Sequence, residues 1–183
     1  MRVFVIGTGR CGTVTLSKAL ALQPSYSVGH ESRTNLFQER LCYPDSHIEV
    51  DNRLSWFTGL LREIYDPQRT VFVHMRRDAH AVAMSYALRY RPGGLLHAFM
   101  HGIIQTKPGN ATYEDRVRTS LLMVESIQSQ CELFLQSVPM AVTIDLEEPR
   151  DGIRLLCEYV HLQKYEDTFL DAMGQVHNAS RPL

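Results

Sequence analysis

Three glycines lie within six residues near the start of the chain, at Gly7, Gly9 and Gly12, directly after the apolar residues 3–6. The apolar run predicts a buried strand, the glycines predict a tight turn, and the chain from Thr13 onward predicts a helix. In such a turn, the backbone N–H groups and the positive end of the helix dipole point toward one place. The chemistry expected there is the binding of a phosphate or a similar anion.

This loop has the spacing of a nucleotide-triphosphatase loop but lacks part of its chemistry. Gly7 and Gly12 match the G-x-x-x-x-G frame, whereas Thr13 and Val14 stand where Lys and Ser/Thr are expected. The lysine that reaches the β- and γ-phosphates and the hydroxyl that holds Mg²⁺ are therefore missing at their positions. These differences argue against ATP chemistry.

Two other anion-binding loops fit less well. The glycines also match the dinucleotide fingerprint, whose acidic residue about 20 positions further on would fall near Glu31, but this pattern alone is weak. A cysteine phosphatase loop needs an arginine six residues after its cysteine, and counting from Cys11 that residue is Ser17. We therefore exclude the cysteine phosphatase loop.

Length and composition limit the class of protein. The chain has 183 residues, 44% of them hydrophobic and 21% charged, with a formal net charge of −1. We expect a single domain, residues 1–183, with a substantial core. Because there is no basic excess, nucleic acid and membrane are not expected as partners, and any anion site must be local. No apolar run approaches the roughly 18 residues of a membrane span.

The cysteines point to a reducing compartment. Cys11, Cys42, Cys131 and Cys157 are scattered, without a C-x-x-C pair, so neither a zinc site nor a disulfide framework is expected. With no secretion signal in the sequence, we expect a cytoplasmic protein. The position of Cys11 at a helix start is one that lowers the pKa of a thiol, but no partner is spaced to make it a nucleophile.

Strand and helix signals alternate along the chain. Short apolar runs predict strands over residues 3–6, 26–29, 47–50, 70–75 and 140–144. Periodicity and capping signals predict helices over residues 13–22, 35–41, 54–65, 79–89, 95–105, 113–135 and 149–160. Thr112-x-x-Asp115 has the form of a capping box before the helix 113–135. This alternation predicts an α/β fold of three layers, with a mainly parallel central sheet and helices on both faces. Polar residues then collect at the carboxyl ends of the strands, where ligands bind in such sheets: 7–13, 30–33, 51–53, 76–78 and Asp145.

The first loop resembles that of a known family. Arg10-Cys11-Gly12-Thr13-Val14-Thr15 is similar to the 5′-phosphosulfate loop of sulfotransferases that use 3′-phosphoadenosine 5′-phosphosulfate (PAPS), whose pattern is close to Lys/Arg-Ser-Gly-Thr-Thr. Cys11 replaces the usual Ser and Val14 the second Thr, for which Thr15 is the substitute. The resemblance implies that the phosphosulfate is bound by the following residues: Gly9, Arg10, Cys11, Gly12, Thr13, Val14 and Thr15.

A second motif resembles the part of the same family that binds the 3′-phosphate of PAPS. That motif is an Arg at the end of a central strand and a Ser eight residues later, which here are Arg77 and Ser85. Asp78 matches the acidic residue that follows the Arg, while Ala79 replaces the usual Pro. Arg76 is the alternative if the alignment shifts by one residue. Two helical turns bring such a Ser near a group that the guanidinium also holds.

A candidate base follows the second predicted strand. Gly29-His30-Glu31-Ser32-Arg33 resembles the Gly-Glu-Glu-Thr-Arg segment of protein-tyrosine sulfotransferases, which implies that Glu31 is the catalytic base. His30 is the neighbouring choice, because small-molecule sulfotransferases use a His. Consecutive residues of an extended segment point in opposite directions, so we expect only one of the two to face the acceptor. Arg10 would stabilise the charge on the leaving diphosphate.

Several other residues have open roles. Arg53, Arg33 and Arg181 are each candidate contacts to donor or acceptor, or else structural or surface arginines. His97 and His101 are four residues apart, but Ala98 stands where the general-base Glu of HExxH would be, and we expect no metal site. The loops 33–45 and 90–112 are the expected walls of the acceptor site.

The resemblance implies a P-loop nucleoside triphosphate hydrolase-like sulfotransferase fold and sulfuryl transfer from PAPS to an acceptor hydroxyl or amine by in-line displacement. The product would be 3′,5′-ADP (PAP), and the acceptor a small molecule, carbohydrate or peptide. Two alternatives stay open. One is a nucleotide kinase-like enzyme with an atypical loop, and the other is a non-catalytic nucleotide-binding module, which a buried salt bridge at Glu31 would favour. The sequence leaves the acceptor and the oligomeric state open.

Overall fold

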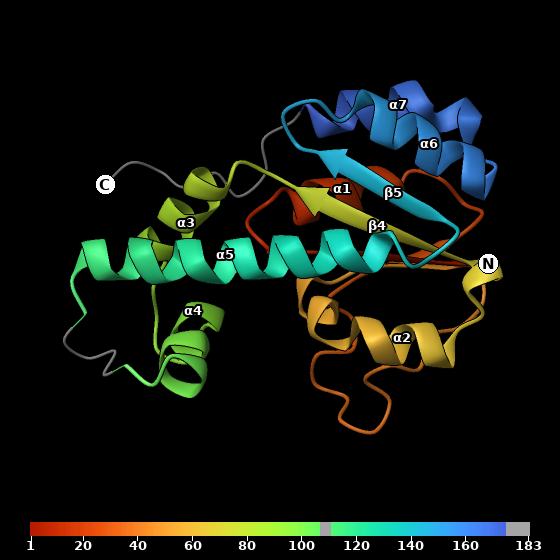
Figure 1. Cartoon of the computed structure of the whole chain (residues 1–183). Coiled ribbons are helices and arrows are strands. Elements are labelled where there is room, and N and C mark those ends of the chain that lie inside the picture. Colours follow the sequence, from red (N-terminus) through yellow and green to blue (C-terminus); the bar gives the residue numbers. More distant parts are fainter. Residues whose placement is uncertain (107–110, 175–183) are drawn as a thin grey trace.

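The computed structural model describes residues 1–106 and 111–174 and contains a five-stranded sheet. Its strands are β1 (Arg2–Gly7), β2 (Ser27–His30), β3 (His47–Val50), β4 (Thr70–Arg76) and β5 (Ala141–Asp145). They pair in the order β2-β3-β1-β4-β5, and every pair is parallel (Figure 1). The predicted parallel sheet is confirmed, and the loops after all five strands leave from one edge.

The described helices lie between β1 and β2, between β3 and β4, between β4 and β5, and after β5. They are α1 (Thr13–Leu20), α2 (Thr58–Ile64), α3 (Ala79–Leu88), α4 (Leu95–Ala98), α5 (Tyr113–Leu135), α6 (Arg150–Val160) and α7 (Glu166–Met173). Shorter helical turns are η1 (Asn52–Phe57), η2 (Pro67–Arg69), η3 (Phe99–Ile103) and η5 (Gln163–Tyr165). Among the described helices, none is both long and apolar enough to cross a membrane.

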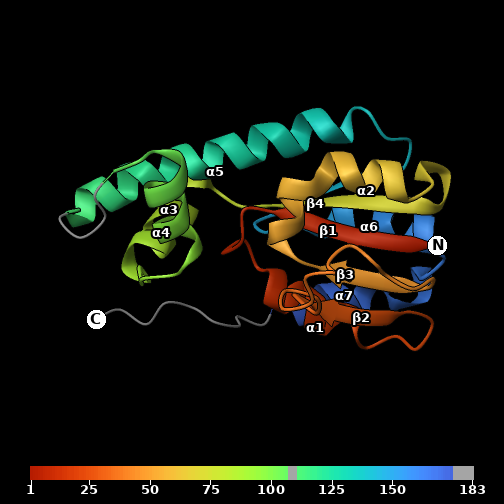
Figure 2. The ribbon, with the colours of Figure 1, turned by 90° about the horizontal axis from the view of Figure 1, so that it is seen from below.

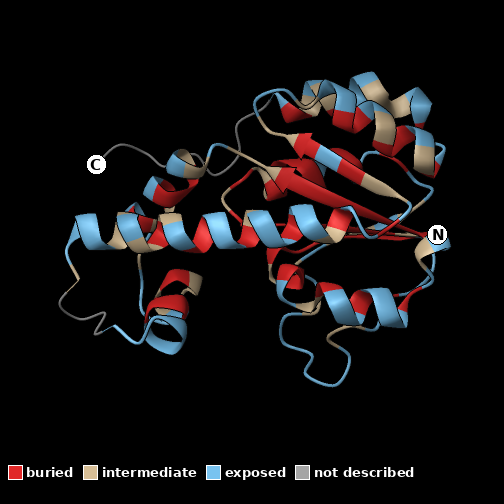
Figure 3. Cartoon of the chain, viewed as in Figure 1, coloured by how far each residue is buried: buried red, intermediate tan, exposed pale blue. Residues whose placement is uncertain are grey.

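Each face of the sheet has its own hydrophobic core. Val3 and Val5 of β1 pack in one core with residues of α1, α6 and α7. Phe4 and Ile6 pack in the other with residues of η1, α2 and α5. Both faces are therefore covered, which explains why the strand reads as a continuous apolar run. Figure 3 shows the central strands almost entirely buried between the two helical layers, so the three-layer α/β architecture is as predicted.

The longest helix, α5, extends beyond the sheet. Its C-terminal half packs on the sheet through residues such as Ile127 and Cys131. Its N-terminal half carries α3 and α4, which lie past the carboxyl ends of the strands (Figure 2). The predicted capping box begins this helix: Asp115 N–H donates to Thr112 Oγ1 at 3.1 Å, and Thr112 N–H donates to Asp115 Oδ2 at 3.1 Å. One helix thus joins the sheet to the α3–α4 pair.

Some predicted elements were wrong. Residues 35–41 form turns and not a helix, because the segment buries no continuous face: Phe37 is 97% exposed, and Arg40 reaches down to Asp51. The predicted helix 54–65 is divided between η1 and α2, and the predicted helix 95–105 between α4 and η3. The helix α7 was missed, because its buried anchors, Phe169 and Met173, amount to a single helical repeat.

A buried histidine in the central sheet predicts how stability depends on pH. His74 of β4 is 0% exposed, and neither ring nitrogen has a hydrogen-bond partner among the described residues. Burial, and then the charge of Arg76, lowers the pKa of His74 to about 4, although Asp145 opposes this. Since the pKa is lower in the folded state, the unfolded chain binds the proton first as the pH falls. Stability is therefore complete above the unfolded pKa and declines as the pH falls toward the folded one.

We expect the wild-type protein to lose about 2 kcal/mol of unfolding free energy between pH 7 and pH 5 through His74. His74→Leu, of similar volume, should abolish most of this loss in urea unfolding measured at the two pH values. The exposed His80 provides the control, because His80→Gln should leave the loss intact. An unchanged pH dependence in His74→Leu would contradict this account.

Candidate functional site

A cavity of about 420 Å³ lies where the loops after β1, β2 and β3 face the α3–α4 region. Six of the residues predicted from the sequence line it: Gly9, Arg10, Thr13, Val14, His30 and Glu31. The opposite wall includes Tyr86, Arg89, Tyr90, Arg91 and His97, from the end of α3 to α4. The expected loop 90–112 thus contributes through its first residues. Arg89 and Tyr86 were not predicted, although they follow Ser85 on the same helix.

The loop after β1 is shaped by Gly12, the N-cap of α1. Its φ of 87° lies in the left-handed region, and a Cβ there would lie 2.6 Å from Leu146 Cδ1. Because glycine has no side chain, it offers no side-chain acceptor to the first N–H groups of α1. The start of α1 thus has no side-chain cap where Thr13 and Val14 line the cavity, as is expected for an anion cradle.

Arg10 brings the two predicted cofactor motifs together. Its Nε donates to Ser85 Oγ at 3.2 Å, and Arg77 Nη1 donates to the Arg10 carbonyl oxygen at 3.2 Å. Burial, and next the charge of Arg89, lowers the pKa of Arg10. Arg10 also has a left-handed backbone, with φ 57°, which is costly for a residue with a side chain. Residues from two distant segments thus converge at one place.

The alternative arginine of the second motif lies elsewhere. Arg76 makes two contacts with Asp145, from Nε at 3.0 Å and Nη2 at 3.3 Å, and a third with Glu132 at 3.3 Å. These carboxylates hold it on the side of β5 and α5. The geometry therefore favours Arg77, the residue beside Arg10, as the arginine of the second motif.

Glu31 lies on the cavity wall in an ion pair. Its Oε2 is 2.6 Å from Arg53 Nη1. This contact is an ion pair whose geometry does not meet that of a hydrogen bond. The side chain of Glu31 is 33% exposed, so the pair is not buried. Glu31 has φ 51°, and this left-handed turn interrupts the alternation of an extended strand. His30 and Glu31 both line the cavity, and which of them would face an acceptor stays a prediction.

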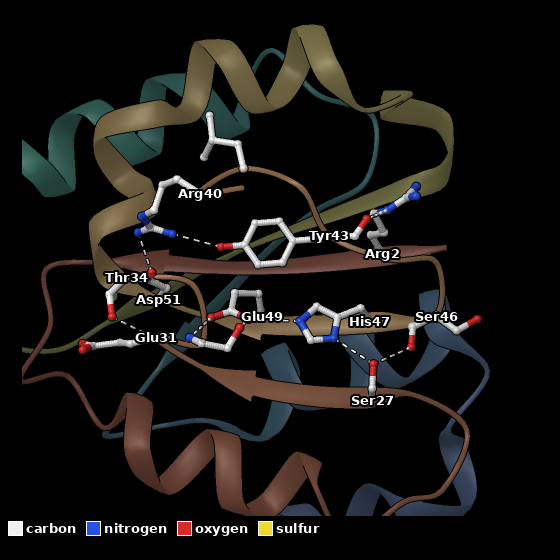
Figure 4. A network of polar contacts seen from close by, with 12 residues as sticks. Arg2, Ser27, Glu31, Thr34, Arg40, Tyr43, Ser46, His47, Glu49 and Asp51 are labelled. Atoms are coloured by element: carbon white, nitrogen blue, oxygen red, sulfur yellow. Dashed lines mark hydrogen bonds and ion pairs between the residues drawn. The ribbon is translucent and has the colours of Figure 1, made fainter. Parts of the chain in front are cut away.

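The segment that carries Glu31 is hydrogen-bonded to a buried carboxylate, that of Glu49 (Figure 4). Glu49 is 0% exposed and accepts hydrogen bonds from Ser32 N–H at 2.7 Å and Ser32 Oγ at 2.5 Å. His47 Nε2 lies 3.0 Å from the same carboxylate, and Ser27 Oγ lies 2.8 Å from His47 Nδ1. Burial alone would raise the pKa of Glu49, but the hydrogen bonds from His47 and Ser32 outweigh it and lower the pKa.

The sequence analysis missed Glu49, although Gly29 is a signal of it. A Cβ at Gly29 would collide with the Glu49 carboxylate and would lie 2.9 Å from Ser32 Oγ. Glycine is therefore required here for space. A second buried carboxylate, Asp51, accepts from Arg53 N–H at 2.8 Å and pairs with Arg40 at 2.6 Å. It fixes the backbone of Arg53, the partner of Glu31.

Other predicted residues lie away from the cavity. Cys11 is completely buried, and burial raises the pKa of its thiol to about 11, so the expected lowering at a helix start was wrong. Thr15 is also buried, at 5% exposure. Arg33 pairs with Glu39 and lines a separate, largely apolar cavity of about 1110 Å³ under the loop 33–44. Arg181 lies outside the described residues.

The two histidines four residues apart lie together, but without a metal-binding group around them. The rings of His97 and His101 stack with their centroids 6.0 Å apart. Within residues 1–106 and 111–174, no group of three or more His, Cys, Asp or Glu side chains is placed to hold a metal ion.

No family model and no curated protein matches the chain. Any assignment of function must therefore depend on the residues of the candidate site, including Arg77 and Ser85, which contact Arg10 but do not line the cavity.

We expect Gly29→Ala to destabilise the protein by about 1–3 kcal/mol, the usual cost of overpacking a filled site. Urea unfolding measures this change. Gly59 of α2 is the matched control, because no described heavy atom lies within 4 Å of a Cβ added there. Gly59→Ala should instead stabilise the helix by about 0.5–1 kcal/mol. Equal effects at both positions would show that the Glu49 contact does not determine the identity of residue 29.

Proposed function

We propose that this chain is a sulfotransferase that transfers a sulfuryl group from PAPS to an acceptor hydroxyl or amine. The proposed scaffold is the P-loop-like sulfotransferase form of the three-layer α/β fold. One observation carries the proposal: Arg10, from the loop after β1, lies between Arg77 and Ser85, which follow β4. Arg10 and Arg77 belong to the two motifs that resemble the PAPS-binding motifs. They are 67 residues apart in the sequence but in contact in the structure.

The residues present fit the two anionic ends of the donor. The N–H groups at the start of α1 and the guanidinium of Arg10 would hold the 5′-phosphosulfate. Arg77 and Ser85 would hold the 3′-phosphate. Arg10 and Ser85 hydrogen-bond each other in the structure, so the groups proposed for the two ends of the donor lie next to each other. The proposed site needs no metal ion, because these groups supply the positive field.

Bound PAPS supplies an activated sulfuryl group, and the chain supplies the base and the stabilising charge. Glu31 would take the acceptor's proton as the new bond to sulfur forms. Arg10 would stabilise the electron pair left on the 5′-phosphate oxygen as the old sulfur–oxygen bond breaks. Both side chains line the same cavity, as this division of roles requires. His30, on the same wall, is the alternative base.

The contact between Glu31 and Arg53 favours a second candidate, a module that binds the nucleotide without transferring a group. The guanidinium of Arg53, 2.6 Å away, engages a carboxylate oxygen of the candidate base. However, both side chains are partly exposed, at 33% and 43%, so an acceptor can reach the carboxylate. The site thus keeps an accessible base, and we prefer the enzyme.

We expect 3′,5′-ADP to stabilise the protein against thermal unfolding, by about 2.7 kcal/mol at a concentration one hundred times its Kd. ADP with Mg²⁺ should give little stabilisation, because the loop lacks the lysine and hydroxyl of kinases. Stabilisation by ADP–Mg²⁺ alone would support the kinase-like alternative.

The double variant Arg77→Gln/Ser85→Ala should weaken 3′,5′-ADP binding at least about tenfold, through the loss of charge-assisted hydrogen bonds. Arg76→Gln is the matched control, since its guanidinium is held by Asp145 and Glu132, and it should bind normally. If instead Arg76→Gln weakens 3′,5′-ADP binding and the double variant binds normally, Arg76 is the residue that contacts the 3′-phosphate.

Glu31→Gln should lower the rate of 3′,5′-ADP formation from PAPS about 10²–10⁴-fold, the usual contribution of a general base. Calorimetry should show unchanged 3′,5′-ADP affinity, because Glu31 is outside the two phosphate motifs. His30→Gln should retain most of the rate. If His30→Gln is the impaired variant, His30 is the base and Glu31 is not. If the wild-type protein binds 3′,5′-ADP but forms no 3′,5′-ADP from PAPS with any acceptor, the non-catalytic module is correct.

A further inference from the structure

The loop after β1 is held at its first residue by a buried hydroxyl. Ser55 of η1 is 1% exposed, and its Oγ accepts from Gly7 N–H at 2.9 Å and donates to the Gly7 carbonyl oxygen at 2.9 Å. One side chain therefore binds both polar backbone groups of the residue at which β1 ends. Ser55 is itself anchored, because Gln130 of α5 donates from Nε2 to the Ser55 carbonyl oxygen at 3.0 Å.

A second hydroxyl holds the same loop from the α3 side of the cavity. Tyr86 donates from its hydroxyl to the Thr8 carbonyl oxygen at 2.5 Å. Burial raises the pKa of the Tyr86 hydroxyl, so the proton that makes this bond is retained at neutral pH. Tyr86 directly follows Ser85, whose Oγ accepts from Arg10. Two consecutive residues of α3 thus contact two positions of one loop.

The space around the loop is filled where these hydroxyls meet it. A Cβ added at Gly9 would lie 2.6 Å from the Tyr86 hydroxyl and 3.0 Å from Asn52 Nδ2. Thr8, between Gly7 and Gly9, is buried, and its Oγ1 donates to the Gly9 carbonyl oxygen at 2.9 Å. The backbone from Gly7 to Gly9 is therefore closely packed and hydrogen-bonded along one path.

The helical turn that supplies Ser55 also supplies the partner of the candidate base. Arg53, two residues before Ser55 on η1, pairs with Glu31 at 2.6 Å. This one short element therefore contacts both the anion loop and the base. An arrangement that is rigid before a ligand arrives lowers the entropy cost of ordering the site on binding.

We infer that Ser55 and Tyr86 are positioning residues of the proposed donor site. They hold residues 7–9 so that Arg10 and the N–H groups at the start of α1 meet the 5′-phosphosulfate without reordering. This inference rests on the proposed function and adds to its site two residues outside both motifs. Ser55 is buried and the Tyr86 proton is donated to Thr8, so both hydroxyls act through the loop.

The test is calorimetric titration of the full chain with 3′,5′-ADP and with adenosine 3′-phosphate, which lacks the 5′-phosphate. The factor by which 3′,5′-ADP binds more tightly measures what the 5′-phosphate adds. We expect this factor to fall at least about fivefold in Ser55→Ala and in Tyr86→Phe, because the loop must then be ordered on binding. The affinity for adenosine 3′-phosphate should change less than about twofold, since the 3′-phosphate contacts are separate.

Two matched variants control for the loss of a buried hydroxyl as such. Tyr65→Phe removes a hydroxyl that donates to the Leu41 carbonyl oxygen at 2.6 Å, far along the chain from the anion loop. Ser120→Ala removes a hydroxyl that is buried in α5 and has no hydrogen-bond partner among the described residues. Both variants should keep the wild-type factor.

Backbone amide NMR relaxation gives a second measurement that needs no ligand. Order parameters at Gly9 and Gly12 should be near about 0.85 in the wild-type protein and both controls, as in rigid backbone. In Ser55→Ala and Tyr86→Phe they should fall by at least about 0.1.

An unchanged factor in either variant would overturn the role of that residue. An equal loss of affinity for the two ligands would also overturn it, because it indicates general disruption and not a loss at the 5′ end. If Ser55→Ala does not fold, Tyr86→Phe, which keeps the ring, decides. Failure of the proposed function looks different: the wild-type protein then binds neither ligand, and the order parameters alone decide whether the two hydroxyls hold the loop.

Discussion

The hydrogen bonds to the buried Glu49 carboxylate determine the arrangement of the candidate site. Glu49 lies on β3, inside the sheet, yet through Ser32 it fixes the loop that leaves the neighbouring strand. A buried carboxylate is tolerated only where its lone pairs are satisfied, so Ser32 and His47 cannot move without exposing an uncompensated charge. Because Glu31 directly precedes Ser32, the position of the candidate base follows from this requirement. The parallel pairing of β2 with β3 then brings the base to the same edge as the phosphate loop.

The electrostatics of the cavity follow a similar logic. Arg10 is crowded by Arg77 and Arg89, and burial and the charge of Arg89 are the largest influences that lower its pKa. Together with the left-handed backbone of Arg10 and Glu31, this places destabilising features at the two residues for which we propose catalytic roles. Backbone strain of this kind costs on the order of 1–3 kcal/mol per residue and persists where the surroundings enforce it.

The sequence predicted the parts of this structure that depend on local pattern. Each described strand was located, most clearly β1 and β4, whose short apolar runs lie between turn residues, and the α5 capping box was read correctly. The order of the strands was not predicted, since pairing joins residues far apart in the chain. The role of Glu49 was missed for a related reason. His47 and Glu49 alternate with apolar residues, as in a half-exposed strand, and only the path of the loop 31–46 over them makes them buried.

The length of α5 has a consequence for how the cavity can change shape. This helix of 23 residues contains neither glycine nor proline, the residues at which helices bend, and it joins the sheet to the α3–α4 wall. A hinge closure of one wall on the other would have to bend an unbroken helix. The segment Pro92-Gly93-Gly94, beside Arg91, is less constrained, and a Cβ added at Gly93 meets no described atom within 4 Å. A change in the shape of the cavity is therefore expected at this short segment and not through bending of α5.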